Sequence, residues 1–168
     1  MTEHHKESFW TKYIFSQDHK IIGLQYGITS LFFLLFGFSL MIVMRYQLVH
    51  SGTISPDTYN SFGAMHGTIM VFLGVVPIVV GAFGNYFVPL QVGAPDMAFP
   101  KLNMASYQAY FLGGVCMLSG FFLPGGAANS GWTSYPPLAD IATTGQTVWL
   151  IGMIFLITSS LLGSINII

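Results

Sequence analysis

Residues 21–44 read IIGLQYGITSLFFLLFGFSLMIVM, a run that contains no Asp, Glu, Lys or Arg and is rich in Leu, Phe, Ile and Met. Three further uncharged runs cover residues 58–92, 102–139 and 141–168. Each run contains a stretch near the roughly 20 residues that a helix needs to cross a bilayer. Hydrophobic residues make up 53% of the chain and charged residues only 7%, whereas soluble domains carry about 25% charged residues. The sequence therefore predicts an all-α transmembrane protein.

Turn residues divide these runs into four expected helices. The third run is too long for one helix and breaks at Leu123-Pro124-Gly125-Gly126, after which a segment rich in Gly, Ser, Asn and Pro is typical of a loop. The expected helices lie near residues 21–46, 61–89, 107–123 and 144–168, in a membrane domain of residues 21–168 that follows an N-terminal segment, 1–20. The last helix runs into the C-terminus without a Gly or Pro stop, as expected of a fragment, a split subunit or part of a longer chain.

The basic residues predict the orientation of a multi-pass membrane protein. Lys6, Lys12 and Lys20 precede the first helix, Lys101 lies between the second and third, and only Arg45 falls on the opposite side. By the positive-inside rule, the N-terminus faces the cytoplasm of a bacterial cytoplasmic membrane or the matrix side of a mitochondrial inner membrane. The net charge of −1 and the lack of a basic stripe give no indication of a nucleic acid partner.

The second helix carries an unusual glycine pattern. On a helix of 3.6 residues per turn, four glycines fall within about 40° of one another: Gly63, Gly67, Gly74 and Gly81. His66 and Gly84 fall together on a neighbouring line about 60° away. A stripe of small residues allows another helix, or a flat macrocycle, to approach the backbone closely.

His66 is the residue of this helix that indicates chemistry. It is expected about one turn inside the membrane, where ionisable groups are rare and usually functional. A neutral imidazole is a good axial ligand for haem iron, and flanking glycines would leave room for the ring. The alternative is a histidine that only forms a hydrogen bond with a neighbouring helix. No other histidine lies in an expected span, so a second axial ligand would come from outside this sequence.

Two residues near the same end of the helices have both a structural and a functional interpretation. Arg45 closes the first helix and is either an interfacial arginine whose guanidinium reaches the polar boundary, or a bidentate donor to a haem substituent. Tyr59 comes just before the second helix and is typical of the aromatic belt of membrane proteins.

The loop between the second and third helices reads GAPDMAFP over residues 93–100. Asp96 lies there, with Asn85 before it and Asn103 and Ser106 after it. A carboxylate, amides and a hydroxyl at a helix mouth can gather protons and hold ordered water. The alternative is a solvated turn in which Asp96 caps the third helix, and spacing alone favours this alternative.

Four stretches of the chain carry a family resemblance. They are MHGTIM at 65–70 with GAFGNYFVPL at 81–90, GAPDMAFP at 93–100, GWTSYPPL at 131–138, and DHK at 18–20 followed by Gly23. Beyond residue ten, the chain resembles the N-terminal third of subunit I of the haem-copper terminal oxidases, the cytochrome c oxidase subunit I family. The resemblance implies four helices of a twelve-helix bundle. It also implies electron transfer from cytochrome c through copper and haem to oxygen, which is reduced to water, coupled to proton pumping.

The resemblance also implies roles for individual residues. His66 is similar to one axial ligand of the low-spin haem, which the family indicates to be haem A. Arg45 matches the arginine that donates to the formyl group of that haem, and Tyr59 matches a tyrosine beside it. Trp132 resembles the tryptophan near the propionates of the oxygen-reducing haem.

Asp96 resembles the mouth of the D proton pathway of the family. The residues that would lie along the lower part of this pathway are Asn85, Asn103, Ser106 and Tyr26. The family often has a second asparagine after the first one of the third helix, and this chain has Met104 there. That departure is expected to alter the order of water at the entrance.

The remaining parts of such an enzyme would come from outside this segment, which carries no catalytic residue of its own. The second haem ligand, the ligands of the oxygen-site haem and of copper, and subunits II and III would complete the complex. The segment alone is expected to be inactive. A quinol oxidase is a rival, but that branch tends to have a histidine where this chain has Thr58, which favours cytochrome c as donor. A non-catalytic membrane scaffold is a rival of another class, and haem content would separate the two.

Overall fold

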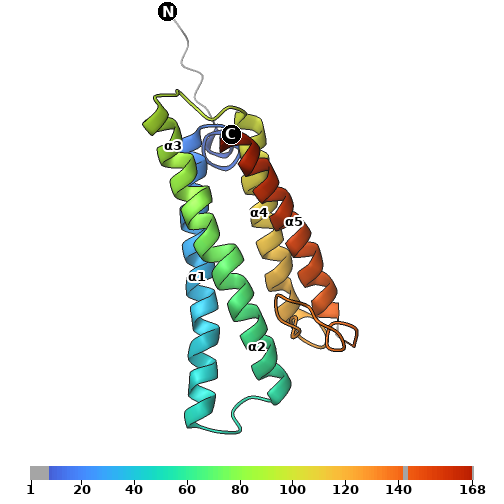
Figure 1. Cartoon of the computed structure of the whole chain (residues 1–168). Helices are drawn as coiled ribbons and strands as arrows, with labels where there is room; N and C mark the ends of the chain where they lie inside the picture. Colours follow the sequence, from blue (N-terminus) through green and yellow to red (C-terminus); the bar gives the residue numbers. More distant parts are fainter. Residues whose placement is uncertain (1–7, 142–143, 168) are drawn as a thin grey trace, which may run out of the picture.

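The computed structural model describes residues 8–141 and 144–167, and every regular element in those residues is a helix (Figure 1). The elements are η1 (Trp10–Ile14), α1 (His19–Val49), α2 (Pro56–Thr68), η2 (Ile69–Val75), η3 (Pro77–Gly84), α3 (Asn85–Val92), α4 (Pro100–Ser119), η4 (Gly120–Phe122) and α5 (Thr144–Ile167). Of the expected segments, residues 1–7, 142–143 and 168 lie outside the described residues. The described residues contain no strand, which confirms the predicted all-α class.

Three of the helical stretches are long and apolar enough to cross a membrane: His19–Val49, Pro56–Val92 and Thr144–Ile167. The chain is an integral membrane protein. The fourth expected span corresponds to α4, which is less apolar because Asn103, Ser106 and other polar residues lie along it. These two side chains are buried inside the structure. The sequence therefore predicts the start of this helix at residue 107, whereas α4 begins at Pro100.

Helix starts in this chain depend on capping. The carboxylate of Asp18 accepts hydrogen bonds from the backbone N–H groups of Lys20 and Ile21, at 2.7 and 3.3 Å, and α1 begins directly after it. The Ser55 hydroxyl accepts from the Thr58 N–H at 3.2 Å, and Pro56 occupies the first position of α2. Both features are favoured at helix N-termini. The second span therefore begins at Pro56 rather than near residue 61.

The second span is one continuous rod whose middle is π-helical. The α-helical hydrogen bonds end after Thr68, and η2 and η3 follow, in which backbone donors reach five residues back; the N–H of Val76, for example, donates to the carbonyl of Val71. Pro77 has no N–H and interrupts the α-helical ladder. The rod ends at Gly93, whose φ of +72° suits glycine, and the Ala94 N–H donates to the Pro89 carbonyl at 2.9 Å.

The helices form two antiparallel pairs, α1 with the second span and α4 with α5 (Figure 1). Apart from Gly114, the buried residues of α4 recur at alternating intervals of three and four positions, as expected where two helices pack along their length. The closest approach is at Gly113 and Gly152, where a Cβ atom added to either glycine would lie 2.9 Å from the carbonyl oxygen of the other.

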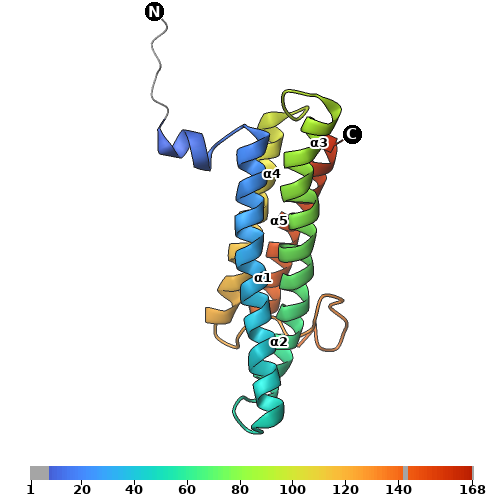
Figure 2. The ribbon, with the colours of Figure 1, turned by 90° about the vertical axis from the view of Figure 1, so that its left-hand side faces the viewer.

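The pairs place the loops and helix ends at two opposite ends of the molecule (Figure 1). The start of α1, the loop 93–99, the start of α4 and the end of α5 share one end, which we call the N-terminal end. The loop 50–55 and the loop 123–141 lie at the other. Figure 2 shows η1 running across the axis of α1, next to the start of that helix.

Candidate functional site

His66 lies in α2 and its ring is tied to α1. The ring nitrogen Nδ1 is 2.8 Å from the carbonyl oxygen of Gly37. A carbonyl oxygen can only accept, so Nδ1 carries the proton and Nε2 keeps its lone pair. A metal-binding histidine in proteins usually has this arrangement, because the bond on the far nitrogen fixes both the tautomer and the ring direction. The imidazole is half-buried, and the lone pair of Nε2 is left available.

The surroundings of His66 leave space on one side. A Cβ atom added to Gly67 would have no atom within 4 Å, so the chain is open beside the histidine. On the other side α1 approaches closely: a Cβ atom on Gly37 would lie 3.1 Å from the Met70 side chain. An imidazole with a fixed tautomer, next to an open face, fits the requirements of an axial haem ligand.

The glycine stripe expected on an ideal helix is only partly correct. Gly63, Gly74 and Gly81 do face α1, where added Cβ atoms would contact Met44, Leu34 and Tyr26 respectively. Gly67 does not belong to this contact, because nothing lies near it. Gly84 is near α5, where an added Cβ atom would lie 3.9 Å from the Ile167 side chain. Gly74 and Gly81 keep the predicted face although they lie in the π-helical segments, whereas Gly67, the exception, lies in the α-helical part of the span.

The position of His66 along the second span follows from the start of α2. Because α2 begins at Pro56, His66 lies roughly 15 Å along the helix from its start, at 1.5 Å per residue. The ligand candidate is therefore well inside the rod.

The other three haem-related candidates occupy the same half of the molecule. Arg45 lies in the last turns of α1 and is exposed. Tyr59 is half-buried in the first turn of α2 and lines a small cavity of about 390 Å³. Trp132 is exposed in the loop 123–141, and its ring centroid lies 5.7 Å from that of Phe72 in η2. Among the described residues no hydrogen bond joins these side chains to His66.

A cluster of hydroxyl groups connects three helices in the other half of the molecule. The hydroxyl of Tyr26 (α1) is 2.8 Å from Oγ of Ser106 (α4) and 3.2 Å from Oγ of Ser159 (α5). The two serine hydroxyls donate to each other's backbone carbonyls, at 2.8 and 2.7 Å. Because each serine hydroxyl already donates its single proton to a carbonyl, the Tyr26 hydroxyl must donate to the Ser106 oxygen. The lone pairs of the Tyr26 oxygen can still accept hydrogen bonds.

Two buried amides near the N-terminal end have unused polar atoms. Asn85 donates through Nδ2 to the Gly81 carbonyl at 2.6 Å, while its Oδ1 has no partner. Asn103 is 1% exposed, and neither its Nδ2 nor its Oδ1 has a partner within the described protein. Buried polar groups are normally paired with protein or with ordered water. These atoms therefore mark positions suited to water.

Asp96 does not cap α4. Its Oδ1 accepts from the N–H of the next residue, Met97, at 2.7 Å, and the residue before α4 is Phe99, which makes no side-chain cap. Capping by Asp96 was the alternative that spacing favoured, and it is wrong. Pro100 at the first helical position removes one donor that would need a cap, and Asn166 of α5 accepts from the Phe99 N–H at 2.8 Å. The half-buried carboxylate thus lies in the loop at the N-terminal end.

A cavity of about 500 Å³ lies between the second span, α4 and α5. Three of the five expected proton-transfer residues line it, namely Tyr26, Asn85 and Ser106, whereas Asp96 and Asn103 do not. Most of its wall is apolar, and its polar lining includes Ser159, Ser160 and Ser164 of α5.

Ser159 and Asn166 are site residues that the sequence reasoning missed. Both are buried polar residues in an otherwise apolar run. The signal was present in the sequence, because Trp149, Gly152, Leu156, Ser159 and Asn166 recur at intervals of three, four, three and seven residues, and all five are buried. Polar residues on the packed stripe of a transmembrane helix contact other helices rather than lipid.

The described residues contain no group of three or more His, Cys, Asp or Glu side chains able to hold a metal ion. Within those residues, His66 is therefore not part of such a group.

Comparison with known proteins agrees with this arrangement. A family model described as "Cytochrome C and Quinol oxidase polypeptide I" matches residues 21–168. The chain is 46% identical to cytochrome c oxidase subunit 1 of Thermostichus vulcanus over its whole length, and 42% identical to that of a Synechocystis strain over 99% of it. It is 43% identical, over 95% of its length, to alternative cytochrome c oxidase subunit 1 of Bradyrhizobium diazoefficiens. The chain spans 31%, 30% and 27% of these relatives. The chain belongs to the cytochrome c and quinol oxidase polypeptide I family.

Proposed function

We propose that this chain is the N-terminal third of the core subunit of a proton-pumping cytochrome c oxidase, which reduces oxygen to water. Its share is one axial ligand of the low-spin haem and the entrance of a proton pathway. The observation that carries the proposal is the hydrogen bond from Nδ1 of His66 to the Gly37 carbonyl, which leaves Nε2 for iron.

His66 would hold a haem of the A type through Nε2, with Arg45 and Tyr59 of the same half of the molecule near the ring substituents. When bound, the haem supplies one-electron transfer at its iron. The protein's part is to fix the imidazole. The Gly37 carbonyl draws on the Nδ1 proton, which makes Nε2 a stronger donor to iron and lowers the tendency of the ring to rotate. Trp132, farther along, would face the propionates of the second haem.

Asp96 would collect protons at the N-terminal end and pass them to water held by the buried amides. Asn85 and Asn103 offer three amide atoms without protein partners, which supports water at both residues. Tyr26 and Ser106 lie deeper, at the cavity, where the lone pairs of the Tyr26 oxygen can accept a hydrogen bond from water. Hydroxyls and amides can relay protons without becoming charged, which is favourable in a low-dielectric interior.

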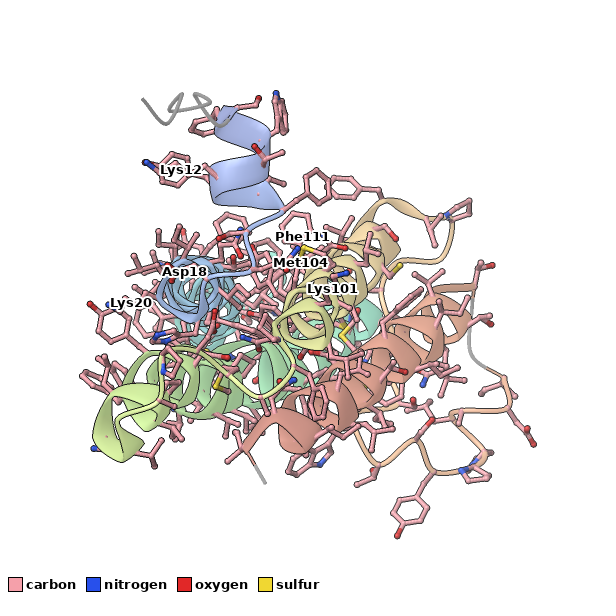
Figure 3. All side chains as sticks on the ribbon, turned by 90° about the horizontal axis from the view of Figure 1, so that it is seen from above. Lys12, Asp18, Lys20, Lys101, Met104 and Phe111 are labelled. Carbon is pink, nitrogen blue, oxygen red and sulfur yellow. The ribbon has the colours of Figure 1, made fainter. Side chains whose placement is uncertain are left out.

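The distribution of charge supports an N-terminus in the cytoplasm or matrix. Lys12, Lys20 and Lys101 come from η1 and the first turns of α1 and α4 and surround the N-terminal end, which Figure 3 shows from above. Arg45 lies toward the opposite end. By the positive-inside rule, the lysine-bearing end is internal, so Asp96 would take protons from the inner side. We also propose that α4 crosses the membrane, because it packs along α5.

The complete enzyme would require further partners. The remaining helices of the subunit would bring its bundle to twelve helices and supply the second axial ligand, the second haem and the copper ligands. Subunits II and III, membrane lipid and cytochrome c would complete the assembly. A quinol donor is the second candidate, since the matching family includes quinol oxidases. Thr58, where the quinol branch tends to have histidine, favours cytochrome c.

The test is His66→Ala in the intact complex that contains this chain, with a pyridine haemochrome assay and a reduced-minus-oxidised spectrum. We expect selective loss of the low-spin haem signal in an assembled complex. His50→Ala is the matched control, because His50 is an exposed histidine at the end of α1, and it should leave the spectrum unchanged. An unchanged spectrum in His66→Ala would mean that the chain packs without binding haem, as the scaffold alternative requires.

A further inference from the structure

Aromatic side chains are exposed on and beside η1, at the N-terminal end of the molecule. Phe9 and Trp10 are each 64% exposed, and Phe15 is 52% exposed. The Phe9 ring contacts two neighbouring rings, with its centroid 6.3 Å from that of Trp10 and 5.2 Å from that of Tyr13. An exposed apolar patch of this kind marks a surface that binds another protein or a membrane.

A side chain of α1 fixes where η1 lies. The amide Nε2 of Gln25 donates to the backbone carbonyl of Tyr13 and, at 3.3 Å, to that of Ile14. These carbonyls are at the end of η1, where a helix leaves carbonyl groups without a partner of its own. Gln25 is six residues beyond His19, roughly 9 Å along α1 at 1.5 Å per residue. The end of η1 is therefore held beside the first two turns of α1, and η1 runs across that helix (Figure 2).

The first two turns of α1 also contain the edge of the membrane. Lys20 is the last charged residue before the apolar run 21–44, and α1 is long and apolar enough to cross a membrane. Charged side chains are costly inside the hydrocarbon layer, so the edge of that layer lies near Lys20. Because η1 lies level with this edge and across α1, it runs along the membrane surface.

The composition of η1 fits lipid better than it fits another helix. Its sequence is WTKYI, with no Gly, Ala or Ser, the small residues that allow membrane helices to pack closely. Lys12 lies in its middle, and lysine is depleted at the centre of protein interfaces. Trp and Tyr, in contrast, are enriched where a membrane meets water, and helices lying there carry lysine on their polar face.

Lys12 provides a positive charge next to the exposed rings. Its Nζ lies 5.3 Å from the centroid of the Tyr13 ring. Lys12, Lys20 and Lys101 all lie at this end of the molecule (Figure 3). Asp18 is the acidic residue between the first two lysines, and its carboxylate already accepts from two backbone N–H groups. Lysines close to a membrane surface attract anionic lipid headgroups.

We propose that η1 is a membrane anchor that binds anionic phospholipid in the leaflet at the N-terminal end. The rings of Phe9, Trp10 and Tyr13 lie among the upper parts of the acyl chains, the Lys12 ammonium contacts the lipid phosphate, and Gln25 holds the segment at this depth. This role depends only on α1 crossing the membrane and is independent of the proposed haem ligation and proton uptake.

The experiment attaches a fluorescent maleimide to Ser8→Cys in the intact complex that contains this chain, held in lipid nanodiscs. Ser8 is exposed and directly precedes the ring cluster. The complex without the added cysteine gives the background from native cysteines such as Cys116. Lipids with brominated acyl chains quench a fluorophore that contacts them, and we expect stronger quenching with bromine near the headgroup than near the chain end. No quenching, as when water or another subunit covers η1, or stronger quenching near the chain end, would overturn the proposal.

Two pairs of variants test the charge and the tie to α1. At the same low fraction in phosphatidylcholine, brominated phosphatidylglycerol should quench more than brominated phosphatidylcholine. Lys12→Gln should lower this preference by up to about fivefold, whereas Lys101→Gln, on α4, should preserve it. Gln25→Leu should weaken quenching by either lipid, whereas Gln47→Leu, at an equally half-buried glutamine near the other end of α1, should not. Equal quenching by the two lipids, a preference unchanged by Lys12→Gln or equally lowered by Lys101→Gln, or unchanged quenching in Gln25→Leu would each refute this role of η1.

Discussion

Replacing Gly152 with alanine should destabilise the contact between α4 and α5. The added Cβ atom would lie 2.6 Å from Cγ of Met117 and 2.9 Å from the carbonyl oxygen of Gly113. The methionine side chain can move to another rotamer, but the carbonyl belongs to the backbone of a packed helix. The helices must therefore separate at their crossing, and contacts on either side of Gly152 would be lost.

The expected cost follows from two opposing terms. An extra methyl group in a packed interior typically costs about 1–3 kcal/mol. Alanine in place of glycine in a helix gains up to about 1 kcal/mol. The net expected loss is about 0–2 kcal/mol for Gly152→Ala. Gly163→Ala is the matched control on the same helix, because its Cβ atom would lie at an ordinary distance of 3.5 Å from the Ser106 hydroxyl. It should gain up to about 1 kcal/mol.

The free energies of unfolding of the two variants should therefore differ by about 1–3 kcal/mol. Gly152→Ala should be less stable than the wild type and Gly163→Ala more stable. The purified complex is kept in a mild detergent and titrated with a denaturing detergent at fixed protein concentration. Its unfolding is measured by near-ultraviolet circular dichroism. A Gly152→Ala complex as resistant as Gly163→Ala would refute the close crossing of the two helices at Gly113 and Gly152.

Three further predictions concern the proposed proton entrance. Asp96→Asn should slow steady-state oxygen consumption about 10²-fold, as expected for loss of a positioned proton donor, while Asp57→Asn, at the start of α2, should not; equal rates in both variants would remove Asp96 from the pathway. Ser159→Ala removes the contact with the Tyr26 hydroxyl and should destabilise the complex by about 1 kcal/mol in the same unfolding assay, so an unchanged midpoint would contradict this hydroxyl cluster. Asn103→Leu removes a buried amide without protein partners, so it should not lower the unfolding midpoint, yet it should slow proton uptake measured with a pH dye; normal uptake would show that the amide holds no functional water.

The membrane spans could be predicted from the sequence because each depends on a local property. Length without charge decided the first and last spans, and the structure places them at His19–Val49 and Thr144–Ile167. The start of α4 was estimated too late because polar residues at its beginning resemble a loop when only apolarity is counted. Their burial depends on α1 and α5, which local sequence does not describe.

The interior of the second span could not be predicted for a different physical reason. An ideal period of 3.6 predicts the face of Gly74 and Gly81 correctly, but it does not predict the π-helical hydrogen bonds of η2 and η3. Within this span, side chains of other helices contact two backbone carbonyls, those of Leu73 and Asn85. The partners of these carbonyls are distant in sequence: Tyr110, which donates to the Leu73 carbonyl, lies in α4, and His19, which donates to the Asn85 carbonyl, is the first residue of α1.

The residues of the candidate site were also predicted only in part. Tyr26, Asn85 and Ser106 were expected from family motifs, and the structure brings them to one cavity. Ser159 was missed although its position on the buried stripe of α5 was visible in the sequence. The expected roles of Arg45 and Trp132 involve the proposed cofactors, so they remain predictions.

The two halves of the second span can be considered together. His66 belongs to its α-helical part and Asn85 begins its final α-helical turns, with sixteen π-helical or linking residues between them, 69–84. Each of these two residues forms a hydrogen bond with α1. The His66 ring donates to the Gly37 carbonyl, and the Asn85 carbonyl accepts from the His19 ring, at 2.8 Å in both cases. A π-helical segment is intrinsically less stable than an α-helix, so these ties and the Tyr110 bond must hold it. The residues proposed for electron transfer and for proton uptake, His66 and Asn85, therefore lie on one helical span. A change in the helical register of that span would move both.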